Sequence, residues 1–307
     1  MPSKRKNKSV SSASESPSPR KPLLVLSGQY QNGKSTFLNC LLGGIYAVEG
    51  KGLATTRYNA KYVFGDFKDG KIVYENGKTT PLSTASNVFS AADTIQDLDK
   101  GSLLQISVYS PLLMGMDILD SPGCGANQQD NTIAEKALSL ADFVVYVLQK
   151  TLDTQEDISF LKNLAEQGKH FTVVLNCRNE TDPGSEMAQS LCREIMAKIK
   201  SESLESNYVA LQQDKPVYPV NLLWAQCGLG YLEEADFQKK MIKLKVYLED
   251  DNITPLSLLA RSNFLPVRML LSSFVSAFFN FTPTSRLSLF STIAENWTSE
   301  LIATIKE

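Results

Sequence analysis

Residues 28–35 read Gly28-Gln29-Tyr30-Gln31-Asn32-Gly33-Lys34-Ser35 and match the phosphate-binding pattern G-x-x-x-x-G-K-[ST] at every position. In such a loop the backbone N–H groups point at nucleotide phosphates, and the following helix adds positive charge from its N-terminus. The pattern assigns Lys34 to the β- and γ-phosphates and the Ser35 hydroxyl to Mg²⁺. A chance match in a chain of this length occurs about once in a hundred sequences. We therefore expect a nucleoside triphosphate to bind along the loop, at Gly28, Gln29, Tyr30, Gln31, Asn32, Gly33, Lys34, Ser35 and Thr36.

The segments around this loop predict the fold. Leu23–Ser27 is a continuous apolar run, which suits a strand buried on both faces of a parallel sheet, and Ser35–Leu42 looks helical. Further along, short apolar segments alternate with helical ones. The expected strands are 57–65, 71–75, 103–109, 116–120, 143–148, 171–176 and 217–221, with Asp69-Gly70 as a turn; the expected helices are 131–140, 155–167, 185–201 and 264–280. This alternation predicts an α/β fold, with a mostly parallel central sheet and helices on both faces.

A second motif, Asp120-Ser121-Pro122-Gly123, follows one of these apolar segments. An acidic residue at the end of a neighbouring strand can hold the water shell of Mg²⁺, and a glycine just beyond can offer its N–H to the γ-phosphate. We therefore assign Asp120 to the metal and Gly123 to the γ-phosphate. Thr56, ahead of the segment 57–65, is a candidate for covering Mg²⁺ from a mobile loop. The alternative is that Thr55 and Thr56 simply begin a strand.

Composition excludes several classes of protein. The 307 residues are 43% hydrophobic and 21% charged, as in globular domains. The net charge of −2 is uneven: residues 1–22 carry six Lys/Arg and one Glu, or +5, so the other 285 residues carry −7. An acidic body argues against a large nucleic-acid footprint. Five scattered cysteines and one histidine exclude a zinc site and suggest reduced thiols. With no apolar signal segment at its start, the chain is expected to be cytoplasmic or peripherally attached to a membrane.

Three regions follow from these patterns. Residues 1–21 form a basic Ser/Pro-rich tail that we expect to be disordered, and residues 22–282 form the nucleotide-binding domain. Residues 283–307 are expected to form an amphipathic helix, because apolar residues recur every three or four positions. This stripe consists of Leu287, Phe290, Ala294, Trp297, Leu301 and Ile305. It either packs on its own domain or docks on a partner chain or a membrane, and the basic tail is a second candidate for contact with anionic lipid.

Taken together, these motifs resemble those of the bacterial dynamin-like GTPases, over roughly residues 22–281. The similarity includes the phosphate loop with its helix through Gly43, the pair Thr55-Thr56, and Asp120–Gly123. It also includes the runs Tyr62–Gly65, Ala141–Val147 and Ser262–Phe264. The resemblance implies GTP and GDP as ligands, Mg²⁺ as cofactor, and stimulation when two G domains pair as a homodimer. Era-like GTPases show a related pattern.

The base-recognition segment departs from this family. Where the family has N-K-x-D, this chain has Asn176-Cys177-Arg178-Asn179. An Asp accepts two hydrogen bonds from guanine, whereas the amide of Asn179 offers one acceptor and one donor, so guanine selectivity is expected to weaken. Asp182 lies three residues further on, out of register. By resemblance, the base site comprises Asn176, Arg178, Asn179 and, from the last base loop, Asn221.

The candidate catalytic residues also differ from those of many small GTPases. Cys124 stands where those proteins place the glutamine that orients the attacking water. Dynamin-like and potassium-dependent GTPases also lack that glutamine. In them a residue of the phosphate loop helps to bind a cation, and Gln31 occupies that position here, so its amide oxygen is a candidate ligand for K⁺ or Na⁺. The candidate catalytic residues are Lys34, Gln31, Thr56 and Gly123. We expect slow intrinsic hydrolysis that accelerates on dimerisation.

The sequence thus predicts a GTPase that acts as a nucleotide switch. Only about 25 residues follow position 282, so we expect one further helix and no full dynamin stalk. One alternative is an Era-like GTPase in ribosome or RNA maturation, which only the basic tail supports. Another is a nucleotide-binding scaffold with weak turnover and relaxed base specificity.

Overall fold

The computed structural model describes residues 21–47, 59–66, 70–74, 76–82, 102–121, 137–177, 181–212 and 215–278. Several sequence predictions lie outside these residues. They concern the tail before Lys21, the helix at 283–307, and the candidate site residues Thr56, Gly123, Arg178 and Asn179.

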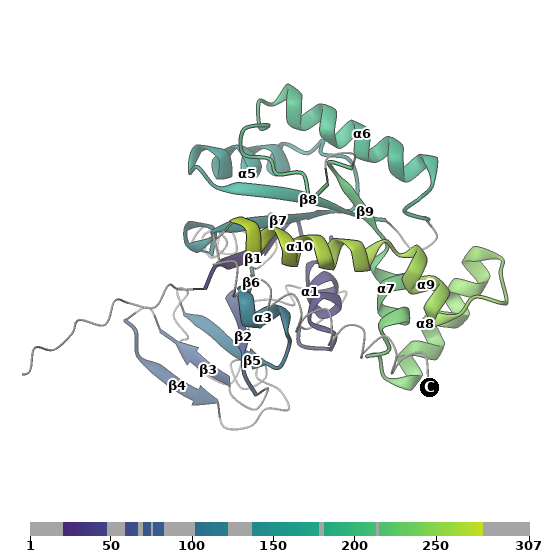
Figure 1. Cartoon of the computed structure of the whole chain (residues 1–307), viewed down its shortest axis with the longest axis horizontal. Coiled ribbons are helices and arrows are strands. Elements are labelled where there is room, and N and C mark those ends of the chain that lie inside the picture. The colour runs from purple at the N-terminus through teal and green to yellow at the C-terminus, as the bar shows by residue number, and fades with distance from the viewer. Residues whose placement is uncertain are drawn as a thin grey trace, which may run out of the picture.

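The described strands form one nine-stranded sheet in the order β4-β3-β5-β2-β6-β1-β7-β8-β9 (Figure 1). Their bounds are β1 Leu23–Ser27, β2 Asn59–Phe64, β3 Gly70–Val73, β4 Thr79–Leu82, β5 Leu103–Val108, β6 Asp117–Asp120, β7 Phe143–Leu148, β8 His170–Asn176 and β9 Tyr218–Val220. β6, β1, β7, β8 and β9 run parallel to one another. β2 runs antiparallel to β6 and parallel to β5, while β3 is antiparallel to both β4 and β5.

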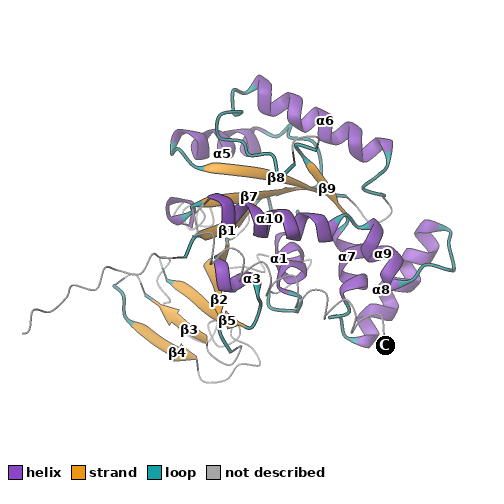
Figure 2. Ribbon diagram, viewed as in Figure 1, coloured by secondary structure: helices purple, strands orange, loops and turns teal. Residues whose placement is uncertain are grey.

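Helices cover both faces of this sheet, as Figure 2 shows. Their bounds are α1 Lys34–Leu42, α3 Leu112–Gly115, α5 Gln155–Glu166, α6 Glu186–Ser201, α7 Leu222–Leu229, α8 Glu234–Leu248, α9 Pro255–Arg261 and α10 Phe264–Phe278. Side chains from α1, α3, α7 and α10 share one hydrophobic core with the sheet, and those from α5 and α6 share a second core. The predicted α/β architecture is therefore confirmed. No helix in the described ranges is long and apolar enough to cross a bilayer.

Sequence periodicity explains the layers. All five residues of β1 are buried, because helices lie against both faces of this central strand. α6 buries Ala188, Cys192, Ile195 and Ile199 at helical spacing, and the Ser185 hydroxyl caps its first turn by accepting from the N–H of Ala188.

The predicted turn at Asp69-Gly70 lies partly outside the described residues, which begin again at Gly70. Gly70 is the first residue of β3, which pairs with β4 and β5 and not with β2. The tight hairpin lies instead between β3 and β4, where Gly77 adopts φ 80° and its N–H donates to the Tyr74 carbonyl at 2.9 Å. A glycine suits this position because it adopts positive φ without a steric cost. Sequence reasoning also missed β4 and the helices α3, α7, α8 and α9.

Candidate phosphate-binding site

The loop between β1 and α1 has a backbone shape that its glycines permit. Gly28 and Gly33 have φ values of 140° and 92°, and Gln31 has a left-handed φ of 65°. A Cβ at Gly28 would lie 2.4 Å from the Val147 carbonyl oxygen, and one at Gly33 would lie 2.6 Å from Nδ2 of Asn176. Side chains at these two positions would therefore force the loop away from β7 and β8. The resulting tight curl ends at Lys34, where α1 begins with its free N–H groups.

Lys34 is buried above this loop. Its Nζ donates to the carbonyl oxygens of Gly28 and Gln29, both at 2.9 Å. The ammonium group is thus held over the backbone that would curl around a phosphate, and it supplies a full positive charge at that point. This placement agrees with the role that the pattern assigns to a loop lysine.

Asp120 reaches the same place from the neighbouring strand. β6 runs parallel to β1 with Asp120 beside Leu26, so both strands end at the same edge of the sheet. Burial raises the pKa of Asp120 to about 6, although the positive charge of Lys34 and a hydrogen bond from Ser35 act in the opposite direction. Lys34, Ser35 and Asp120 therefore interact with one another, as the two motifs predict.

The donor set at this point fits Mg²⁺. Oδ1 of Asp120 is buried and has no hydrogen-bond partner within the described part of the chain. A carboxylate oxygen and the adjacent Ser35 hydroxyl are hard oxygen ligands of the kind that Mg²⁺ takes together with phosphate oxygens and water. Asp120 and Ser35 are therefore suited to hold the metal.

Two further strands brace the loop, β7 through a backbone carbonyl and β8 through a side chain. Asn32 Nδ2 donates to the Val147 carbonyl at 3.0 Å, and the Asn32 carbonyl accepts from Asn176 Nδ2 at 3.1 Å. Oδ1 of Asn176 accepts from the N–H of Leu222 at 3.4 Å, where α7 begins. The structure thus places Asn176, a predicted base contact, as a link between the phosphate loop and α7.

A third brace was not predicted from the sequence. Nε2 of Gln29 donates to Oγ1 of Thr154 at 2.7 Å, and this hydroxyl donates to Oδ2 of Asp157 at 2.5 Å. Oδ1 of the buried Asp157 accepts from the Tyr146 hydroxyl. Thr154 is also the N-cap of α5, so the spacing T-x-x-D before a helix was the available signal. This network ties the second residue of the loop to β7 and α5.

The predicted base-recognition side is built from β8, β9 and α7. Cys177 N–H donates to the Val220 carbonyl at 2.6 Å, which fixes the chain just after β8. The buried Asn221 side chain caps α7 by accepting from Trp224 N–H at 3.1 Å, and it donates to the Thr181 carbonyl at 3.1 Å. Asn221 therefore organises this region through its side chain.

Asp182, the out-of-register acid, is engaged elsewhere. Its Oδ2 accepts from Nη2 of Arg261 at 3.0 Å, and its Oδ1 accepts from Gly184 N–H at 2.7 Å. The Arg261 guanidinium lies 5.0 Å from the centre of the Trp224 ring. These contacts hold Asp182 against α9, so it is not free to replace a guanine-binding aspartate.

The remaining predicted site residues fall into two groups. Tyr30 and Thr36 are half-buried in and after the loop, and Gln31 is exposed. Residues Thr56, Gly123, Arg178 and Asn179 lie outside the described ranges, so their assignments stay predictions.

Comparison with known proteins identifies a family and several relatives of this chain. A model of the dynamin family matches residues 24–178. Dynamin-like protein 2 of Campylobacter jejuni is 24% identical over 244 residues, which cover 75% of this chain and 39% of that protein. The probable transmembrane GTPase FZO-like, chloroplastic, of Arabidopsis thaliana is 25% identical over 156 residues, covering 50% of this chain and 15% of that protein.

A solved structure of an oligomerised bacterial dynamin pair has a similar fold. It superposes with a TM-score of 0.50 at 18% identity, over 94% of this chain and 55% of that one. The match with the two curated relatives spans less than two fifths of their own length.

Proposed function

The chain belongs to the dynamin family, and from that premise we propose that it binds GTP and hydrolyses it to GDP and phosphate. The observation that carries this proposal is the convergence of Lys34, Ser35 and Asp120 at one edge of the sheet, beside a loop of phosphate-binding shape. Phosphoryl transfer needs little covalent chemistry from a protein, so an arrangement that positions phosphates and neutralises their charge is sufficient for catalysis.

Each residue has a defined part in this proposal. Lys34 exchanges its two carbonyl acceptors for oxygens of the β- and γ-phosphates, while the loop N–H groups and the start of α1 hold the remaining charge. Ser35 and Asp120 hold Mg²⁺, which when bound neutralises negative charge on the phosphates. Thr56 and Gly123 complete the γ-phosphate site in our assignment, which rests on the sequence pattern.

Gln31 is the proposed monovalent-cation ligand. It is exposed at the turn of the loop, where its backbone is left-handed. An exposed loop residue is accessible to K⁺ or Na⁺ and to a second G domain. We therefore propose that hydrolysis is slow in the monomer and is stimulated by pairing of two G domains as a homodimer.

Membership of the dynamin family supports specificity for guanine. The segment Asn176–Asn179, which is predicted to contact the base, is expected to weaken that specificity. Asn179 replaces the expected acid, and Asp182 is held by Arg261. The test is a competition assay in which GTP, ATP and XTP displace a fluorescent GTP analogue from wild-type protein and from Asn179→Asp. Asn179→Asp is expected to strengthen the preference for GTP, because an aspartate restores the second acceptor for guanine. Equal competition by ATP and GTP would remove the guanine assignment but keep the phosphate site.

A nucleotide-binding scaffold with little turnover and relaxed base specificity is the second candidate, and the engagement of Asp182 by Arg261 favours the relaxed specificity. Single-turnover hydrolysis measured at increasing protein concentration separates the two functions. A rate that rises with concentration supports a dimerising GTPase, whereas a flat rate near zero supports the scaffold. Lys34→Ala gives the background rate.

We also propose a peripheral attachment to membranes, through the basic tail of residues 1–21. The names of the relatives support this setting, since one is described as a transmembrane GTPase and the bacterial pair is described as sensing and tethering membranes. Flotation of the purified protein with anionic vesicles and GTP tests it, and absence from the lipid fraction would contradict it.

A further inference from the structure

Three large apolar side chains are exposed together at one end of the sheet. They are Phe64 at the end of β2, Tyr109 just after β5 and Met114 on α3, which are 37%, 77% and 42% exposed. The rings of Phe64 and Tyr109 lie 5.3 Å apart. We call these three residues the strand-end patch. Grouped exposed apolar residues of this size commonly mark a contact surface.

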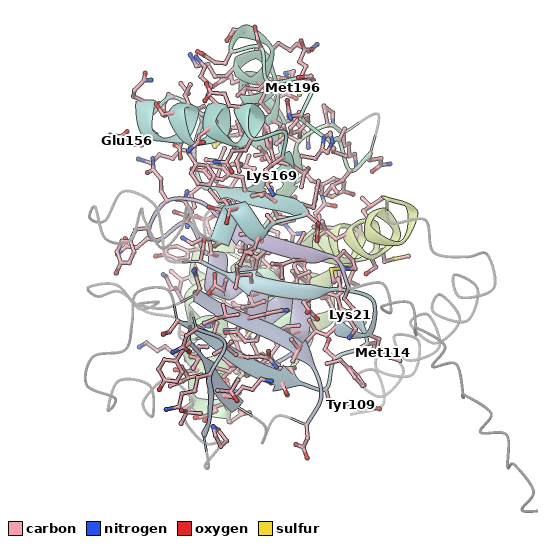
Figure 3. The ribbon with its side chains drawn as sticks, turned by 90° about the vertical axis from the view of Figure 1, so that its left-hand side faces the viewer. Lys21, Tyr109, Met114, Glu156, Lys169 and Met196 are labelled. Atoms are coloured by element: carbon pink, nitrogen blue, oxygen red, sulfur yellow. The ribbon has the colours of Figure 1, made fainter. Side chains whose placement is uncertain are left out.

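The patch lies at the opposite edge of the sheet from the phosphate loop. β2 is antiparallel to β6 with Tyr62 beside Ile118, so Phe64 lies where β6 begins, whereas the loop lies where β1 and β6 end. Lys21 enters at the same edge, and its Nζ donates to the Leu113 carbonyl at 2.9 Å. Figure 3 shows Lys21, Tyr109 and Met114 close together on this part of the molecule.

The patch continues the hydrophobic core to the surface. Ala60 and Tyr62 belong to the core beneath α1, α3 and α10, and alternation along β2 places Phe64 on that same face. Leu112 and Leu113, which precede Met114, are buried in this core as well. A segment that packed on the patch would therefore extend an existing apolar layer.

The chain leaves the described part of the structure toward this edge. α10 begins after Ser262, whose carbonyl accepts from Asn221 N–H at the carboxyl end of β9, and it packs against α3. Its 15 residues span about 22 Å, from the nucleotide edge back toward the edge that carries the patch. Figure 1 shows α10 crossing the sheet in this way. Residues 279–307 continue from Phe278, the last residue of α10.

We propose that the apolar stripe of residues 287–305 docks on the strand-end patch of the same chain. The stripe supplies Phe290, Trp297 and Leu301 at helical spacing, which matches an uncovered surface of aromatic and thioether side chains. Charge is compatible with this fit, because Glu300 lies three positions after Trp297, on the same side of a helix, and Lys21 borders the patch. The docking is intramolecular, and it does not depend on the proposed GTPase activity.

Tryptophan fluorescence of the full-length chain tests this directly. The chain has two tryptophans, and Trp224 is fully buried, so acrylamide quenching beyond a small background reports on Trp297. A Trp297→Phe version of each protein measures the Trp224 background. Docking predicts that Trp297 is protected in the wild type, and that Tyr109→Lys with Met114→Lys raises its quenching constant several-fold.

Met187→Lys is the matched control, because Met187 is 67% exposed on α6, on the other face of the sheet. It is expected to leave Trp297 quenching at the wild-type value. Equal quenching in wild type and patch variant overturns the proposal, as does protection that appears only at high protein concentration or only with vesicles. These last two results would assign the stripe to a second copy or to a lipid surface.

Cross-linking supplies a second measurement that needs no lysine substitutions, so their effect on folding does not enter it. Met114→Cys combined with Leu301→Cys is expected to form an intramolecular bismaleimide cross-link, identified by peptide mass spectrometry. Met187→Cys with Leu301→Cys is the control pair. Equal yields for the two pairs would overturn the proposal.

Discussion

Asp120 gives the site a dependence on pH that can be measured without a nucleotide. Burial raises its pKa from 3.8 to about 6. Below about pH 3 the carboxyl group is protonated in most folded and unfolded molecules, so its burial has little electrostatic effect. Between about pH 4 and 6 the unfolded state releases the proton first, so stability falls as pH rises, by at most about 3 kcal/mol.

We therefore predict that Asp120→Asn stabilises the nucleotide-free protein at pH 7 and has almost no effect near pH 4. Urea unfolding at four pH values between 4 and 7 measures this difference. Asp182→Asn is the control, because that carboxylate is partly exposed and paired with Arg261. A stability gain in Asp120→Asn that is the same at every pH would contradict the assigned pKa.

The bond between Gln29 and Thr154 predicts a coupled effect on nucleotide binding. Gln29→Ala and Thr154→Val each remove the 2.7 Å contact that fixes the second residue of the loop. A net hydrogen bond contributes about 0.5–1.5 kcal/mol, so each change should weaken GTP binding by roughly two- to tenfold. The double variant should have the same GTP affinity as the single variant with the lower affinity, because both substitutions remove the same contact.

Thr154→Ser is the control for this cycle, since it keeps the hydroxyl and the cap of α5. Thr154→Val also lowers stability by about 1 kcal/mol through the lost cap, which thermal unfolding measures separately. Strictly additive losses of GTP affinity in the double variant would show that Gln29 and Thr154 act independently.

For single residues, the sequence predicted those parts of the candidate site that depend on a local motif. The loop pattern assigned Lys34 and Ser35, and the strand before Asp120 placed its carboxylate at the same edge. The contacts of Asn176 with Asn32, and of Asp182 with Arg261, join residues 144 and 79 positions apart. Such pairs depend on tertiary packing, which no local pattern encodes.

At the scale of elements, the buried strands and amphipathic helices were predictable. Phe143–Leu148 was predicted to the residue, and α5, α6 and β8 to within one or two residues, because their periodicity is clear. The tight turn between β3 and β4 was not predicted, although its Asn76-Gly77 pair is a strong turn signal. α7 was missed because it is apolar on most sides and so shows little helical periodicity.

The contact between α7 and α9 gives a prediction for stability. A Cβ at Gly228 would lie 2.3 Å from Cβ of Leu259 and 2.7 Å from the Pro255 carbonyl oxygen. Gly228→Ala must therefore separate the two helices, at a cost of about 1–3 kcal/mol in the free energy of unfolding. Urea denaturation measures this loss.

Gly230→Ala provides the comparison, because Gly230 has open space around its Cβ position and only its positive φ opposes a side chain. Its cost should be about 1 kcal/mol, from the left-handed backbone alone. A smaller loss in Gly228→Ala than in Gly230→Ala would contradict the close packing of α7 on α9.

At the scale of the whole molecule, the two proposed sites lie at opposite edges of the sheet. The nucleotide site lies where the parallel strands end, and the strand-end patch lies where they begin, with α10 running between the two. Alternating strands and helices predicted a parallel sheet. The antiparallel pairing of β2 with β6, which brings Phe64 to the patch edge, is a property of strand order that the sequence pattern does not reveal.

The phosphate site carries the proposed function, so the decisive measurement is an equilibrium titration of the protein with a fluorescent GTP analogue and Mg²⁺. It should be run on wild type and on Lys34→Ala, with Lys162→Ala as control, because Lys162 pairs with Glu202 on the surface. Wild type and Lys162→Ala should bind saturably and release the analogue when excess GDP is added, while Lys34→Ala should lose at least about tenfold in affinity. Equal binding by Lys34→Ala, or no binding by folded wild type, would contradict the assignment.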